Sequence, residues 1–588
     1  MLIKQGIPVS PGVALHKALV LDSEDQPVPR RTVPASRVLT ELTLFDEAVA
    51  RSIKQLRDLE KQTTESLGSE LARIFAFHIG MLNDTNLLDQ VRTLIRADRV
   101  TAEYAVSTVL RRLEDVFLEQ DASYFRDRVG DINDLERRVL KELRPAAKSK
   151  LHDLTEPVVL IAHDLTPSQT ADFDRSKVMA IAIDAGGRTS HTAILAHALG
   201  IPAVVGLGDL TQSVTSGDAV IIDGNLGRVV ISPDSESVLA YQQAARRFAA
   251  FTNELAEIQS KPAETTDGVA IELLANIEFP TEIHDALAQG AVGVGLYRTE
   301  FLYLGSESPP SEDEQVLSYV EAIRSLDGRP LTIRTLDLGA DKVAPGLGAL
   351  TTAERNPFLG CRSIRLCLQN LPMFRTQIRA ILRASAEGPV RVMFPLISNI
   401  NELRQARMIF SDVCEDLEDQ GIPFNEDIPI GMMIEVPSAA IQAATFAREV
   451  DFFSVGTNDL IQYTVAVDRS NEKIASLYSA AHPAVIALVR DVVRVARRAK
   501  IGISLCGEMA GEPEFALLLL GLGLRSLSVT PPAIPGVKKL IRSVSMSQCE
   551  RIARRVRSFD SDREVSNYLR DEAERMMPEA FGGRSITY

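Results

Sequence analysis

The spacing of hydrophobic positions changes its period several times along the chain. Residues 1–22 predict a strand, a turn at Ser10-Pro11-Gly12 and a second strand. From about residue 35 to residue 145 the apolar positions follow a helical period instead. One helical face consists of Val38, Leu42, Phe45, Val49 and Leu56, and another of Val106, Val109, Leu110, Leu113, Val116 and Phe117. This segment therefore predicts a helical bundle.

Strand patterns return after residue 147 as four short apolar runs, PVVLIAHDL, VMAIAIDA, IPAVVGL and DAVIIDG. We expect residues 1–22 and 147–232 to form one α/β domain, with the helical bundle of residues 35–145 inserted into it. Ser232-Pro233 then predicts a helix N-cap with proline at the first helical position. The Ala-rich segment that follows predicts a linker helix over residues 233–261.

Strand-like and helical patterns alternate throughout residues 262–577. Eight apolar runs recur there, IELLANI, VGVGLYR, LTIRTLDL, VRVMFPL, IGMMIEV, FFSVG, ISLCGE and SLSVT. Eight such repeats over about 310 residues favour a closed (β/α)₈ barrel, with a doubly wound open sheet as the alternative. The expected fold class is therefore a multidomain α/β protein with a C-terminal barrel.

Composition narrows the functional classes. A chain of 588 residues is too long for one ordinary core, and its net charge of −15 argues against general nucleic-acid binding. No run approaches the roughly 18 apolar residues of a membrane span, and Pro8 and Pro11 interrupt any signal-peptide pattern. We expect a cytoplasmic protein. Its five scattered cysteines, without a C-x-x-C pair, indicate neither a disulfide framework nor a zinc site.

One histidine stands at an unusual junction. Residues 186–192 read Gly-Gly-Arg-Thr-Ser-His-Thr, between an apolar strand pattern and a helical pattern. The glycines permit a tight turn and the hydroxyls suit a helix start, whose backbone N–H groups favour an arriving phosphate. His191 is then either a nucleophile reached from outside or a packed residue in a capped turn.

The residues that follow the barrel strands carry the other candidate chemistry, because barrel sites form at the carboxyl ends of strands. Arginines bind phosphate or carboxylate through paired donors, and four are candidates for such a clamp: Arg298, Arg334, Arg362 and Arg469. Glu435 and Asp459 are hard oxygen ligands suited to Mg²⁺. Taken singly, the arginines could instead form solvated ion pairs, and Glu435 or Asp459 could instead be a helix N-cap. Cys506 is either buried filler or a proton donor.

Several long segments resemble enzyme I of the bacterial phosphotransferase system, the phosphoenolpyruvate-protein phosphotransferases. These are SPGVALHKALVL, GGRTSHTAILAHALGIPAVVG, GLYRTEFLY, IRTLDLGADK, NPFLGCRSIRL, MMIEVPSAA, VDFFSVGTNDLIQYTVAVDR and LCGEMAG. The resemblance covers essentially the whole chain. It implies a swivelling phosphohistidine domain, an inserted helical domain and a phosphoenolpyruvate-binding barrel.

The resemblance also implies a role for each candidate. His191 would take the phosphoryl group, Cys506 would protonate the enolate carbon to give pyruvate, and Glu435 and Asp459 would hold Mg²⁺. The implied substrate-binding residues are Arg298, Arg334, Arg362, Lys342, Asn458 and Arg469. The bundle would dock the histidine phosphocarrier HPr, the barrel would form a homodimer, and neither nucleic acid nor membrane would be a partner. His191 would swing between the two sites to begin sugar uptake.

Two positions depart from the family pattern, and both lack a positive charge. His197 stands where the family usually has arginine, and Asn133 where its bundle often ends in Val-Arg-Asp. Among related enzymes, pyruvate phosphate dikinase and phosphoenolpyruvate synthase would need an ATP-grasp region before residue 147. A nitrogen-branch paralogue and a non-catalytic phosphoenolpyruvate-sensing regulator remain as alternatives.

Overall fold

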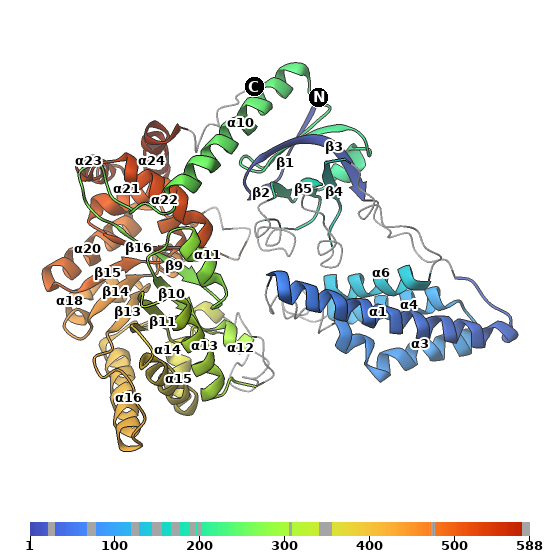
Figure 1. Ribbon diagram of the computed structural model, residues 1–588, viewed down its shortest axis with the longest axis horizontal. Coiled ribbons are helices and arrows are strands. Elements are labelled where there is room, and N and C mark those ends of the chain that lie inside the picture. The colour runs from blue at the N-terminus through green and yellow to red at the C-terminus, as the bar shows by residue number, and fades with distance from the viewer. Residues whose placement is uncertain are drawn as a thin grey trace. The chain divides into compact units, whose positions relative to one another are not determined.

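The computed structural model divides into two compact units, which meet in the chain between Ala249 and Ala250. It describes residues 1–21, 30–67, 78–118, 129–143, 156–165, 177–186, 196, 201–304, 308–339, 356–469, 471, 474 and 477–578. The first unit contains a sheet and a group of helices, and the second is a barrel (Figure 1). The candidates His191, His197 and Lys342 lie outside the described residues, as does the side chain of Asn133.

The described part of the first unit contains a mixed sheet with the strand order β1-β8-β7-β3-β4-β5-β6-β2. The strands are β1 (Leu2–Gln5), β2 (Ile7–Ser10), β3 (Val13–Leu21), β4 (Val158–Ala162), β5 (Val178–Ile183), β6 (Ala203–Val205), β7 (Ala219–Asp223) and β8 (Arg228–Ile231). All four strand patterns after residue 147 form strands, whereas β8 was not predicted. The strand β3 pairs in parallel with β4 and antiparallel with β7, so the two ends of the sequence segment 1–232 share one sheet.

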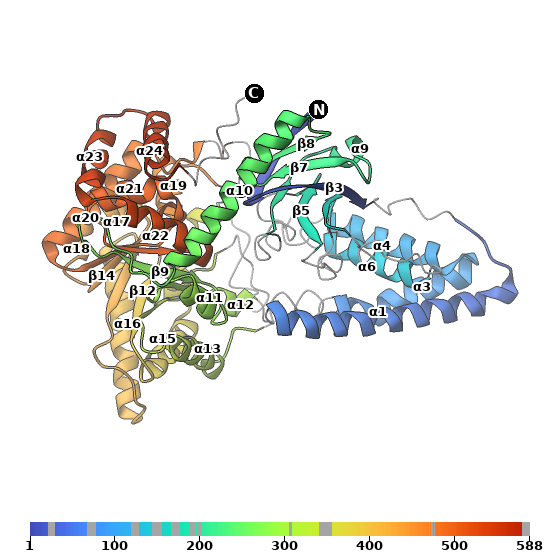
Figure 2. The ribbon, with the colours of Figure 1, turned by 45° about the horizontal axis from the view of Figure 1, so that its top comes forward.

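The described residues of the predicted helical bundle form helices. It contains α1 (Val38–Leu67), α3 (Thr85–Asp98), α4 (Ala102–Leu118) and α6 (Val129–Leu143), which lie side by side (Figure 2). Leu42, Phe45, Val49 and Leu56 are buried, and the second predicted face buries its residues from 106 to 110. Asp84 caps α3 by accepting a hydrogen bond from the Asn86 amide at 2.8 Å. Val38 and Leu113 are partly buried against the same core, and the side chains of Val116 and Phe117 lie outside the described ones. For the described side chains, the helical period identified the buried face correctly.

The expected cap at Ser232 is wrong. The short helix α9 (Leu210–Ser213) precedes this region, and the linker helix α10 runs over Ser235–Ile258. Ser232 has a φ of 49°, and its amide donates to the carbonyl of Ala219 in β7 at 3.0 Å, so it continues the pairing of β8 with β7. Asp234 caps α10 instead, because its carboxylate accepts from the Ser237 amide at 2.8 Å.

The described residues of the second unit form a closed barrel whose neighbouring strands are all parallel. The strands are β9 (Glu272–Ile277), β10 (Val294–Arg298), β11 (Leu331–Arg334), β12 (Val390–Phe394), β13 (Ile430–Ile434), β14 (Phe452–Val455), β15 (Gly502–Leu505) and β16 (Ser526–Val529). Each predicted apolar run contains one of them, apart from β15, which begins one residue before its run. Pairing of β16 with β9, from Ser526 opposite Glu272 onward, closes the ring and excludes the open sheet.

Helices follow the strands along the chain. The described ones are α11 (Glu282–Ala288), α12 (Phe301–Leu304), α13 (Glu312–Ser325), α14 (Ile364–Gln369), α15 (Leu371–Ser385), α16 (Ile400–Asp419), α17 (Pro437–Ile441), α18 (Ala443–Phe446), α19 (Thr457–Val465), α20 (Pro483–Ala499), α21 (Pro513–Leu522), α22 (Ile534–Ser543), α23 (Met546–Val556) and α24 (Asp562–Met576). Residues 515–520 of α21 are all buried, because α22, α23 and α24 pack on this apolar helix.

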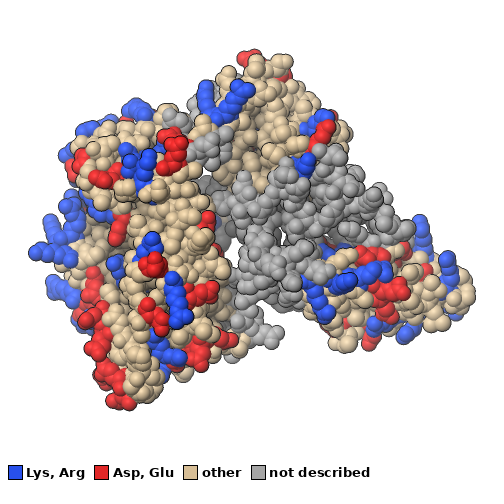
Figure 3. Space-filling model, viewed as in Figure 1, with Lys and Arg blue, Asp and Glu red and all other residues tan. Residues whose placement is uncertain are grey.

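The surface agrees with a chain of mixed charge. Acidic and basic side chains are interspersed over the visible face of each unit (Figure 3). Among the helices that the structure describes, none has a stretch long and apolar enough to cross a lipid bilayer.

Candidate active site

Charged side chains gather where the barrel strands end. Arg298 and Arg334 are the last residues of β10 and β11, Glu435 and Cys506 directly follow β13 and β15, and Asp459 lies in the first turn of α19. Because the strands are parallel, these positions share the carboxyl end of the barrel. The barrel register thus assembles residues that are separated by up to about 200 positions in the sequence.

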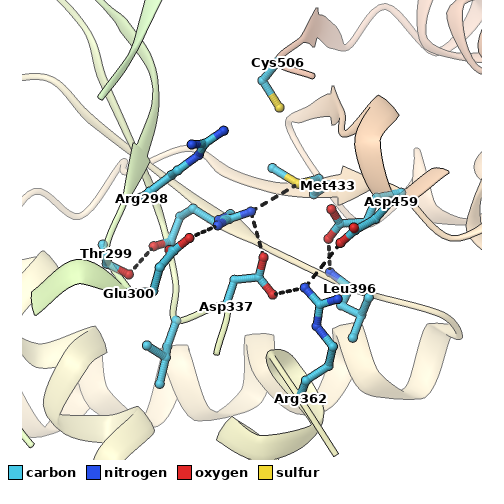
Figure 4. A network of polar contacts seen from close by, with 12 residues as sticks. Arg298, Thr299, Glu300, Asp337, Arg362, Leu396, Met433, Asp459 and Cys506 are labelled. Atoms are coloured by element: carbon cyan, nitrogen blue, oxygen red, sulfur yellow. Dashed lines mark hydrogen bonds and ion pairs between the residues drawn. The ribbon is translucent and has the colours of Figure 1, made fainter. Parts of the chain in front are cut away.

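A continuous chain of buried ion pairs crosses this end of the barrel (Figure 4). Arg334 Nη2 donates to Glu300 Oε1 at 2.7 Å, and Arg334 Nη1 lies 2.9 Å from Asp337 Oδ2. The other Asp337 oxygen accepts from Arg362 Nη2 at 3.0 Å, and Arg362 Nη2 also reaches Asp459 Oδ2 at 3.3 Å. All five residues are less than 9% exposed, so their charges are held in place away from bulk water.

Negative charge exceeds positive charge in this buried group. Among the described buried residues, the four carboxylates Glu300, Asp337, Glu435 and Asp459 lie near two arginines, Arg334 and Arg362, and Glu300 and Asp337 have further contacts. Burial, followed by the charges of Asp459 and Asp337, raises the pKa of Glu435 to about 8. Burial alone would lower the pKa of Arg334, but its carboxylate neighbours raise that pKa above the ordinary value. The surplus of carboxylates favours a bound cation here.

The two buried arginines retain donors for a ligand. Arg334 Nε and Arg362 Nε are buried, and neither has a hydrogen-bond acceptor among the described residues. A buried donor without an acceptor is costly, and an oxyanion placed beside it removes that cost. Glu435 is itself oriented, because its Oε1 accepts a hydrogen bond from the Leu396 amide at 2.6 Å.

Arg298 is more accessible than the other two arginines. Its side chain is 29% exposed, and Nη1 donates to Glu278 Oε1 at 2.9 Å. Figure 4 shows its guanidinium on the same side of the ion-pair chain as the Cys506 thiol. Arg298 therefore presents a positive charge above the buried network, where an incoming anion would meet it.

Cys506 is buried in an apolar part of the barrel, beside Leu296, Met393 and Met433. Burial raises the pKa of its thiol, and a hydrogen bond from Ser454 lowers it by less. In that bond Ser454 Oγ donates to Cys506 Sγ at 3.2 Å. The thiol is therefore protonated at neutral pH, which is the state a general acid requires.

Asn458 and Arg469 occupy a neighbouring part of the barrel end. The Asn458 amide pairs with Glu508, donating to Oε1 at 2.9 Å and accepting from the backbone N–H at 3.0 Å. Tyr478 Oη donates to the Asn458 carbonyl at 3.0 Å, and the exposed Arg469 acts electrostatically on Tyr478. These contacts bring Asn458 and Arg469 together through Tyr478, at the edge of the buried network.

The carboxylates at this end of the barrel are candidate metal ligands. No group of three or more His, Cys, Asp or Glu within the described part of the chain is arranged to hold a metal ion. Magnesium nevertheless needs only one or two carboxylates, since waters and substrate oxygens complete its coordination. Glu435 and Asp459, whose mutual repulsion contributes to the raised Glu435 pKa, fit that requirement.

Several important residues had no predicted role. Glu300 and Asp337 lie within the same strand-end motifs as Arg298 and Arg334, and this proximity in the sequence could have indicated a role for them. Ser454 and Tyr463 carried no signal, because their contacts depend on strand register. The Tyr463 hydroxyl oxygen accepts a hydrogen bond from Arg362 Nη1 at 3.4 Å.

A closed parallel barrel with buried arginines and carboxylates at its carboxyl end defines a class of enzymes that bind small, highly charged anions. The sequence also matches three domains of one family. Residues 252–546 match the PEP-binding domain of PEP-utilising enzymes, residues 5–128 match the N-terminal domain and residues 154–227 match the mobile domain. The chain belongs to the family of PEP-utilising enzymes.

Relatives of similar length carry one name. The phosphoenolpyruvate-protein phosphotransferase of Geobacillus stearothermophilus is 42% identical over 96% of this chain and 97% of its own. That of Bacillus subtilis (strain 168) is 39% identical over 96% of this chain and 99% of its own. A solution structure of an Enzyme I protein is 35% identical and covers 42% of this chain and 99% of the solved chain, with a TM-score of 0.37.

Proposed function

We propose that the protein is a phosphoenolpyruvate-protein phosphotransferase, which transfers the phosphoryl group of phosphoenolpyruvate to its own His191 and releases pyruvate. The observation that carries the proposal is the buried chain Glu300–Arg334–Asp337–Arg362–Asp459, with donors left for an anion beside a protonated Cys506. The names and full-length similarity of the relatives support the same activity.

The reaction needs positioning and charge stabilisation more than covalent chemistry. Arg298, Arg334 and Arg469 would hold the phosphate, while Arg362, Lys342 and Asn458 would complete the substrate site. An imidazole nitrogen of His191 forms a bond to phosphorus as the bond from phosphorus to the enolate oxygen breaks. The enolate carbon then takes the proton of the Cys506 thiol, which gives pyruvate and leaves a thiolate that water reprotonates.

Glu435 and Asp459 would hold a Mg²⁺ ion. When bound, the ion would supply positive charge to offset the carboxylate surplus and to orient substrate oxygens. The raised pKa of Glu435, caused first by burial and then by Asp459, supports a cation at this position.

The partners follow from the same proposal. In the cytoplasm, phosphorylated His191 would pass its phosphoryl group to a histidine of an HPr-type phosphocarrier docked on the helical bundle. This transfer would begin sugar uptake. The barrel would form a homodimer. The regulatory alternative is less favoured, because a non-catalytic regulator would have no need of the oriented Glu435 or the protonated Cys506.

The decisive experiment uses phosphoenolpyruvate labelled on phosphorus, with Mg²⁺ and the full chain. We expect label on the protein that acid removes and base does not, as for phosphohistidine. His191→Ala should abolish it, whereas Arg334→Lys should slow its appearance. Added HPr should accept the label. Label that survives His191→Ala, or no label in the wild type, would contradict the proposal.

A further inference from the structure

A pocket lies at the opposite end of the barrel from the candidate active site. Its volume is about 630 Å³, and it is lined by Pro262, Ala263, Ala270, Ile271, Glu272, Val292, Arg497, Ile503, Gly523, Arg525 and Ser526. Glu272 and Ser526 are the first residues of β9 and β16, whereas the active-site residues follow the last ones. A ligand here would therefore be remote from the bound phosphoenolpyruvate.

Two arginines face this pocket without a carboxylate partner. Within the described residues, no carboxylate lies within 4.0 Å of Arg497 or Arg525, although the charges of Glu550 and Asp267 act on Arg525 from farther away. Arg525 Nη1 donates to two neutral carbonyls, those of Leu520 at 3.2 Å and Leu524 at 2.7 Å. Burial, followed by the positive charge of Arg497, lowers the pKa of Arg525, so the two cations lie close enough to repel each other.

A glycine permits the close approach of Arg497. Gly523 ends α21 with a φ of +109°, and a Cβ built on it would lie 2.9 Å from Arg497 Nη1. A side chain at position 523 would therefore displace the guanidinium that it contacts. The backbone thus leaves room for the guanidinium of Arg497 at the wall of the pocket.

The remaining walls define the rest of a ligand. Most are apolar, and they include Pro262, Ala263, Ala270, Ile271 and Val292. Glu272 is the acidic residue among them and disfavours a second negative charge on the ligand. Two guanidiniums beside apolar walls suit one carboxylate on a small apolar body.

We propose that this pocket binds a small apolar monocarboxylate, whose carboxylate is shared between Arg497 and Arg525. Pro262 and Ala263 belong to the segment that joins α10 to β9, so the apolar part of the ligand would rest against the segment that follows the linker helix. The site goes beyond the proposed phosphotransfer and does not depend on it.

Benzoate is a suitable probe, and benzamide is its neutral counterpart of nearly the same shape. Binding to the full chain would be followed by saturation-transfer NMR and calorimetry. We expect benzoate to bind and benzamide to bind at least about tenfold more weakly, a difference of about 1.4 kcal/mol. Excess phosphoenolpyruvate should not displace benzoate, because its site is at the other end of the barrel.

Three variants with expected effects in opposite directions on benzoate affinity complete the test. Arg497→Gln, at an exposed residue, should weaken benzoate binding about tenfold, and Glu272→Gln should strengthen it severalfold. Gly523→Ala should also weaken it by displacing Arg497. Equal binding of benzoate and benzamide, an unchanged affinity in Arg497→Gln, or displacement by phosphoenolpyruvate would each overturn the proposal. Label transfer to His191, measured on the same samples, tests the proposed function separately.

Discussion

Removal of the Ser454 hydroxyl should make Cys506 a weaker acid. Ser454 Oγ donates to Cys506 Sγ at 3.2 Å, and this bond lowers the pKa that burial raises. A hydrogen bond to a charged group contributes about 1.5–3 kcal/mol, against about 1 kcal/mol for a neutral pair. Ser454→Ala therefore destabilises the thiolate by roughly 0.5–2 kcal/mol more than the thiol, which raises the pKa of Cys506 and lowers its acid dissociation constant about 2- to 30-fold.

The assay is alkylation of Cys506 by iodoacetamide, followed at that residue by mass spectrometry over a range of pH. Below the thiol pKa, the thiolate fraction falls tenfold for each unit by which the pKa rises. We expect the alkylation rate of Ser454→Ala to fall about 2- to 30-fold, in proportion to the thiolate fraction. Pyruvate formation in a single turnover should slow in parallel, because a weaker acid protonates the enolate carbon less readily.

Ser504→Ala is the matched control. Ser504 Oγ donates to Ser454 Oγ at 3.3 Å and has no hydrogen bond to the thiol. This variant should leave both rates close to those of the wild type. An alkylation rate that stays equal or rises in Ser454→Ala would refute the role given to this hydroxyl.

The remaining predictions concern the arginine network, the carboxylate surplus and the core. Arg334→Lys should lower kcat/KM for phosphoenolpyruvate about 100-fold, because one ammonium cannot bind both Glu300 and Asp337. Arg329 contacts a backbone carbonyl through its Nη1, so Arg329→Lys should have little effect. Steady-state kinetics of the two variants measure the difference. The pKa of Glu435 rises from 4.5 to about 8 on folding, so its contribution to the unfolding free energy in the absence of Mg²⁺ should be present below pH 4.5 and be lost as the pH rises to 8. Urea unfolding of wild type against Glu435→Gln over this pH range measures that loss, and parallel curves would contradict it. Leu518→Ala in the buried helix α21 should cost about 2–5 kcal/mol, whereas Leu317→Ala, at 70% exposure, should cost less than about 0.5 kcal/mol. Thermal unfolding of the barrel compares the two, and equal effects would show that α21 is not part of its core.

The sequence by itself determined the elements and most of the candidate residues. Period-two and apolar runs predict all eight barrel strands, and the helical period selects Phe45 and Leu56 for the bundle core, because both patterns record which side faces away from water. Arg298, Arg334 and Glu435 stand out because each follows such a run. The predicted cap of α10 is wrong by two residues, because Ser232 and Asp234 are both good caps and the pairing of Ser232 with β7 decides between them.

Only the tertiary structure decided which charges meet. Arg362 and Asp459 are 97 positions apart, and their contact depends on the closure and register of the barrel. The same closure buries more carboxylates than arginines at one end and leaves Arg497 and Arg525 without carboxylate partners at the other, among the residues that are described. Pairing and burial set the pKa of Glu435 and the protonation of Cys506. Both depend on neighbours brought close by folding, and local sequence holds no record of those distances.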